Sequence, residues 1–184
     1  MSTIISLYGG PGTGKSTSAA HLFALLKMEG VNAELVQEYV KQWAWEKRTP
    51  VKYDQFYFFG HQSRREYSLF NAVDVLVTDS PVSIVAYYAH AYGSPEQDNL
   101  FQKMAKLYFE MAQAEGHKHI HIWLSRVKPF DPKGRFHTEE QAKEVDIDMR
   151  NYLTKMLGLE LHNFEGSAEG VLMIFNFLRS EGLL

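Results

Sequence analysis

The chain has 184 residues, a length that suits a single domain with one sizeable core. Its formal net charge of −3 excludes a protein that attracts nucleic acid through a strong overall positive field, although a local basic groove remains compatible. Because there is no cysteine, disulfide frameworks, thiolate metal sites and cysteine nucleophiles are excluded as well. The start of the chain has the pattern of a strand, not of a secretion signal, and no apolar run reaches membrane-spanning length. We therefore expect a cytoplasmic protein.

The first predicted elements are a buried strand at residues 3–8, a glycine-rich loop at 9–17 and a helix that continues to about Glu29. The fixed positions of the phosphate-loop pattern G-x-x-x-x-G-K-S/T are filled by Gly9, Gly14, Lys15 and Ser16. Strand, loop and helix in this order are the setting that the pattern requires. The sequence therefore predicts binding of a nucleoside triphosphate.

Each residue type in this loop has a chemical reason. Glycines let consecutive backbone N–H groups turn toward one anion, and the helix N-terminus adds partial positive charge. Lys15 is expected to reach the β- and γ-phosphates, and the Ser16 hydroxyl to bind Mg²⁺. The predicted nucleotide-binding set is Gly9, Gly10, Gly12, Thr13, Gly14, Lys15, Ser16 and Thr17.

Further along the chain, strand and helix patterns alternate. Strands are predicted at residues 33–37, 73–78, 119–124 and 159–164, and helices at 39–46, 53–71, 82–90, 96–115, 138–157 and 171–179. This alternation predicts an α/β fold, with a parallel sheet covered by helices on both faces.

Two carboxylates follow predicted strands, at the edge where parallel sheets bind ligands. Asp79 is the candidate second Mg²⁺ group, and the alternative is an N-cap for the helix after Pro81. Glu38 is the candidate general base for an acceptor hydroxyl, and the alternative is an exposed carboxylate at a strand end.

A basic loop begins directly after the fourth strand, at about residues 126–137. Its cations are Arg126, Lys128, Lys133 and Arg135. Such a loop can act as a mobile lid that brings positive charge to a migrating phosphoryl group, or it can be a solvated connection. Thr138 and Gln141 then have the spacing of a capping box at the start of a helix.

Two further groups of side chains leave alternatives open. Aromatic residues are dense between Tyr39 and Phe59, and since consecutive ones cannot share one helix face, some are candidates for stacking on a planar acceptor. His117, His119 and His121 alternate along a strand, where three imidazoles could bind zinc, but no acidic partner is adjacent.

With these motifs identified, the chain resembles the phosphate-loop kinases, and among them the nicotinamide riboside kinase-like branch of small AAA-type ATPases found in bacteria and phages. The stretches that carry the resemblance are Gly9–Thr17, Gln37–Val40, Val77–Pro81, Lys128–Arg135 and Thr138–Glu140. The resemblance implies a phosphate-loop NTPase three-layer sandwich, with a five-stranded parallel sheet of order 2-3-1-4-5.

The resemblance also implies roles for individual residues. ATP is the implied donor, Glu38 matches the base of related kinases, and Arg126 and Arg135 match their lid arginines. No Asn-Lys-x-Asp guanine motif is present, which argues against a GTPase. We therefore expect an ATP- and Mg²⁺-dependent kinase for a nucleoside-like hydroxyl. The alternatives are a nucleotide monophosphate acceptor, a hydroxylated base or end in DNA, and an ATP-binding regulator without an acceptor.

Overall fold

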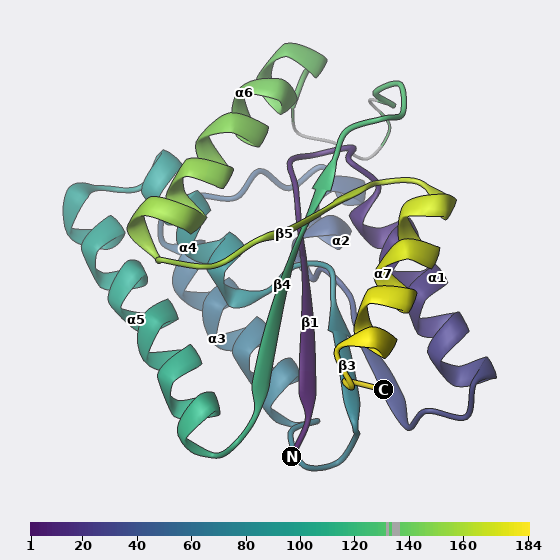
Figure 1. Ribbon diagram of the computed structural model, residues 1–184. Helices are drawn as coiled ribbons and strands as arrows, with labels where there is room; N and C mark the ends of the chain where they lie inside the picture. The colour runs from purple at the N-terminus through teal and green to yellow at the C-terminus, as the bar shows by residue number, and fades with distance from the viewer. Residues whose placement is uncertain (132, 134–136) are drawn as a thin grey trace.

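The protein folds around one five-stranded parallel sheet, seen in a computed structural model that describes residues 1–131, 133 and 137–184 (Figure 1). The strand order is β2-β3-β1-β4-β5, which confirms the predicted topology. The strands are β1 (Thr3–Tyr8), β2 (Ala33–Val36), β3 (Val75–Thr78), β4 (Lys118–Ser125) and β5 (His162–Glu165). All neighbouring pairs are parallel, so the carboxyl ends of the strands meet at one edge, the top in Figure 1.

Helices cover both faces of this sheet. They are α1 (Lys15–Met28), α2 (Val40–Trp45), α3 (Asp54–Tyr67), α4 (Val82–Tyr92), α5 (Pro95–Ala114), α6 (Glu139–Asn151), the π-helical turn η1 (Tyr152–Met156) and α7 (Ala168–Ser180). Helices α1 and α7 pack together on one face, and α2 to α6 contribute to the core on the other (Figure 1). The predicted three-layer sandwich is confirmed.

Side-chain alternation along β4 separates the two cores. Ile120 and Ile122 pack toward α1 and α7, whereas Trp123 belongs to the core under α4 and α5. His119 and His121 share the side of Trp123, where their rings contact Phe109. Burial lowers the pKa of His119 to about 4 and that of His121 to about 3. Among the described residues no group of three metal-binding side chains is present, and these two partly buried rings pack against Phe109 and against each other.

The last third of the chain departs from the predicted boundaries. The helix predicted to reach residue 157 is α-helical only to Asn151 and then widens into η1. The Leu159 N–H donates to the Leu153 carbonyl, which turns the chain after this π-helical turn. The last strand is therefore shorter than predicted and pairs only over His162–Glu165. Within the described residues, no helix is both long and apolar enough to cross a membrane.

Candidate active site

The phosphate loop lies between β1 and α1, at the centre of the carboxyl edge. Gly14 is the N-cap of α1 and has a left-handed backbone, with φ of +97°. No side chain caps this helix within the described part of the chain, so the first-turn N–H groups face the loop. The N-terminus of a helix left open in this way is an anion-binding site.

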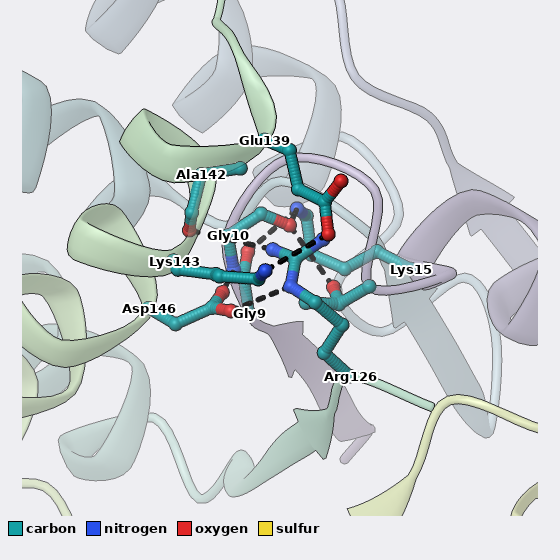
Figure 2. A network of polar contacts seen from close by, with 9 residues as sticks. Gly9, Gly10, Lys15, Arg126, Glu139, Ala142, Lys143 and Asp146 are labelled. Carbon is teal, nitrogen blue, oxygen red and sulfur yellow. Dashed lines mark hydrogen bonds and ion pairs between the residues drawn. The ribbon is translucent and has the colours of Figure 1, made fainter. Parts of the chain in front are cut away.

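Lys15 folds back over this loop. Its Nζ donates to the carbonyl oxygens of Gly9, at 2.6 Å, and Gly10, at 3.1 Å (Figure 2). These bonds hold the ammonium group above the anion-binding backbone. Phosphate oxygens are stronger partners for an ammonium ion than neutral carbonyls are, so the lysine can exchange one set for the other.

Asp79 and Glu38 meet because β2 and β3 end side by side, with Val36 paired to Thr78. The Glu38 N–H donates to Asp79 Oδ1 at 2.6 Å, and Asp79 is buried. The alternative role of Asp79 as a helix cap is wrong, because Pro81 is the N-cap of α4. The carboxylate instead fixes the backbone that carries the predicted base.

The donor chemistry at this edge fits Mg²⁺. This ion takes oxygen ligands, and in phosphate-binding sites it is held by one or two protein groups together with substrate phosphates. The Ser16 hydroxyl and the Asp79 carboxylate are donors of that kind, and one Asp79 oxygen is already used by the Glu38 N–H. Of the protein groups described, these two would hold the ion.

A buried acid of α3 binds the end of β3. Glu66 of α3 accepts hydrogen bonds from Thr78 and Gln62 on Oε1, at 3.1 and 3.0 Å, and from Tyr108 on Oε2, at 3.1 Å. Burial raises the pKa of this carboxyl to about 7, against the effect of the three hydrogen bonds. Because Thr78 directly precedes Asp79, this network fixes the strand end that carries the metal-binding candidate.

A cavity of about 460 Å³ opens beside the phosphate loop. Lys15 and Glu38 both line it, so the structure brings the predicted phosphate ligand and the predicted base to one space. Its α4 wall carries Tyr88 and Tyr92, whose rings stack at 6.0 Å and 12°. His137 lines the same space and hydrogen-bonds the Tyr92 hydroxyl through Nε2 at 3.2 Å. Burial, and secondly the charge of Lys15, lower the pKa of His137.

The predicted lid is described in part. Arg126 lies beside the phosphate loop: a side-chain carbon added at Gly12 would lie 3.1 Å from its Nη1 atom. Arg135 and its neighbours 132, 134 and 136 lie outside the described residues, so the role of Arg135 as a lid arginine stays a prediction. His137 ends the predicted lid and reaches the cavity.

The aromatic-rich segment divides as helix geometry requires. Trp43 and Phe59 are core residues, Phe58 is buried and also lines the cavity, and Trp45 and Tyr53 are exposed. The sequence analysis did not predict Tyr88 and Tyr92 as site residues, although their i, i+4 spacing puts them on one helix face. Asp146 of α6, which contacts both the loop and Arg126, was also missed, since no local motif marks it.

The sequence matches a known protein family, and the fold is similar to that of several solved structures. The family model AAA_28, described as an AAA domain, matches residues 4–169. No curated protein sequence matches the chain. The NadR protein solved with NAD and AMP-PNP is similar over 97% of this chain and 49% of its own, with 15% identity and a TM-score of 0.71.

Two other solved structures have the same fold. The NadR protein solved with NR shares 15% identity over 96% of this chain and 51% of its own, with a TM-score of 0.67. The deoxyadenosine kinase from M. mycoides, solved with the products dCMP and dCDP, shares 16% identity over 96% of this chain and 99% of its own, with a TM-score of 0.60. The chain spans about half the length of the NadR chains and nearly the whole of the deoxyadenosine kinase.

Proposed function

The chain belongs to the AAA domain family AAA_28, and from this premise we propose that it is a kinase that transfers the γ-phosphoryl group of ATP to a hydroxyl of a nucleoside-like acceptor. The observation that carries the proposal is the shared cavity of Lys15 and Glu38. A simple nucleotide-binding protein needs the phosphate loop. Such a protein does not need a carboxylate, here Glu38, in a cavity with aromatic walls beside the loop.

Each group then has a task in the reaction. The acceptor hydroxyl loses its proton to the Glu38 carboxylate as its oxygen forms a bond to the γ-phosphorus, and the bond to the ADP oxygen breaks. Lys15 and Arg126 balance the charge that spreads over the phosphoryl oxygens. When bound, Mg²⁺ supplies further positive charge to the phosphates, and Ser16 and Asp79 are the groups that would hold it.

The cavity supports an acceptor with a planar ring. Tyr88, Tyr92 and Phe58 offer apolar ring surface, and Glu38 offers a hydrogen-bond acceptor for a hydroxyl. The similar NadR structure contains NR, and the similar deoxyadenosine kinase contains deoxynucleotides, which agrees with a nucleoside-like acceptor.

A nucleotide monophosphate is the second candidate acceptor. Lys41 and Lys52 also line the cavity, and a nucleoside needs no such cations. Either lysine is a suitable partner for an acceptor phosphate. The two candidates differ in charge, so they can be separated by direct competition.

The test is a panel of ribonucleosides, deoxynucleosides, NR, nucleotide monophosphates and oligonucleotides, each incubated with labelled ATP and Mg²⁺. We expect label to pass to a free nucleoside-like compound in the wild type, but not in Lys15→Ala or Glu38→Gln. Selective labelling of a monophosphate would favour the second candidate. Binding and labelling of oligonucleotides that weaken steeply with salt would indicate a DNA acceptor.

ATP binding without label transfer to any acceptor would indicate a regulator or ATPase and would contradict the proposal. Because the panel includes NR and nucleotide monophosphates, it contains a ligand of the kind found in each of the two similar structures.

A further inference from the structure

Asp146 joins two parts of the candidate site that lie far apart in the sequence. Its Oδ1 accepts the Gly10 N–H at 2.7 Å, and its Oδ2 accepts Arg126 Nε–H at 2.9 Å (Figure 2). One carboxylate of α6 thus connects the phosphate loop with the residue that follows β4. Its side chain keeps only 20% exposure, so the contact with Arg126 is largely shielded from water.

The approach of α6 to the loop depends on the absence of a side chain at Gly10. A carbon added there would collide with Asp146 Oδ1 and would lie 2.9 Å from the Ala142 carbonyl oxygen. The Gly10 N–H, expected from the sequence to face phosphate, is instead bound to this carboxylate. The absence of a side chain at Gly10 therefore allows α6 to pack against the phosphate loop.

Arg126 is held along one side only. Nε binds Asp146, and Nη2 donates to the Ala142 carbonyl at 3.3 Å. Nη1 is buried and has no hydrogen-bond partner among the residues that the structure describes. It lies next to Gly12 of the phosphate loop. A buried N–H without an acceptor is costly, and a phosphate oxygen at the loop would satisfy it.

We infer that Asp146 is a positioning residue, which holds the guanidinium of Arg126 so that Nη1 faces the phosphoryl group bound at the loop. The inference rests on the proposed function. A long arginine side chain without this partner would sample many rotamers, and catalytic groups lose rate when they are misplaced by even an ångström. Asp146 itself does not line the cavity. It acts through Arg126.

The variant Asp146→Asn separates the two contacts. The amide oxygen can still accept the Gly10 N–H, whereas the amide nitrogen cannot accept from Arg126 Nε. The matched control is Asp148→Asn, because Asp148 is exposed on the same helix and lies two residues away. Both changes remove one negative charge from α6.

Turnover and ATP affinity are measured separately, the latter by titration with a fluorescent ATP analogue. We expect Asp146→Asn to lower kcat by about 10- to 100-fold, as misplacement of a catalytic group does, with a much smaller change in ATP affinity. Asp148→Asn should behave as the wild type. In an Arg126→Ala background, Asp146→Asn should cause no further loss, because its effect passes through the arginine. Wild-type kcat in Asp146→Asn, or fully additive losses, would overturn the inference.

A second measurement needs no substrate. In ¹⁵N-arginine-labelled protein, the Arg126 Nε–H should exchange slowly with water, and exchange should become fast in Asp146→Asn but not in Asp148→Asn. Fast exchange in the wild type would overturn the inference. A chain with the protected Nε–H but without phosphoryl transfer would contradict the proposed function alone, and an active wild type with an equally active Asp146→Asn would contradict the inference alone.

Discussion

Replacement of Glu66 by glutamine should change how the stability of this protein depends on pH. Glu66 is fully buried, and burial raises its pKa from the ordinary 4.5 to about 7. The folded protein therefore keeps this proton at pH values where the unfolded chain has released it. The stabilisation that comes from the protonated acid is complete below about pH 4.5, and it is lost as the pH rises through about 7.

The size of this effect follows from the same two values. At about 1.36 kcal/mol per pH unit, the interval from 4.5 to about 7 corresponds to a loss of about 3 kcal/mol in the free energy of unfolding. Glutamine has nearly the same shape and no charge, so the free energy of unfolding of the glutamine variant does not fall in this way as the pH rises. It can also keep an acceptor oxygen for Thr78 and Gln62.

The assay is urea unfolding of the wild type and of Glu66→Gln between about pH 4.5 and about pH 8.5. The quantity of interest is the difference between the two free energies of unfolding at each pH, because the buried histidines contribute equally to both proteins. We expect this difference to move by about 3 kcal/mol in favour of the glutamine variant as the pH rises. Glu34→Gln, at an exposed position in β2, serves as the control.

A difference that stays constant across this range would refute the reasoning. It would mean that the three donors around Glu66 stabilise the carboxylate enough to cancel the effect of burial. A difference that moves in the opposite direction would mean that the hydrogen bonds outweigh burial.

Four other changes test the site and the core. Lys15→Ala should abolish most binding of a fluorescent ATP analogue while circular dichroism stays unchanged, and near-normal binding would contradict the phosphate-loop assignment. Glu38→Gln should lower kcat by about 10²- to 10⁴-fold with ATP affinity preserved, as loss of a general base does, whereas full turnover at saturating acceptor would exclude that role. Tyr88→Ala should raise the acceptor KM by about 10-fold through lost stacking, and an unchanged KM would place the acceptor elsewhere. Because the pKa of His119 is lowered to about 4 from the ordinary 6.5, its contribution to stability is complete above about pH 6.5 and is lost as the pH falls toward 4. Acid unfolding of His119→Phe should therefore begin at a lower pH than that of the wild type, and an unchanged midpoint would contradict this.

The sequence predicted those parts of the site whose chemistry lies in one short stretch. Nine consecutive residues specify the phosphate loop, and the apolar strand before Asp79 identifies that carboxylate as a strand-end group. The alternative of Asp79 as a helix cap was wrong, because the N–H that its carboxylate accepts belongs to Glu38, 41 residues earlier. A contact across two strands leaves no local pattern.

The remaining groups of the site were missed for the same physical reason. These groups, Tyr88, Tyr92 and Asp146, lie inside helices, where their residue types are common. The residues next to them in the sequence do not indicate which cavity or loop they face. Their roles depend on how α4 and α6 pack at the sheet edge, and only the three-dimensional arrangement contains that information.

The central place of β1 in the sheet has a consequence for synthesis on the ribosome. The phosphate loop directly follows β1, yet β1 pairs with β4, which lies more than a hundred residues later, and the loop is braced by Asp146 and by Gly166, which packs against the Thr13 carbonyl. Such distant pairings form slowly, and a growing chain lacks the last of these supports until residue 166 has been made. Under the proposed function, a nucleotide would therefore stabilise the fold only after these later residues have been made. ATP would then stabilise only chains in which β4, Asp146 and Gly166 have already taken their places, since a shorter nascent chain carries the whole motif but none of these later supports.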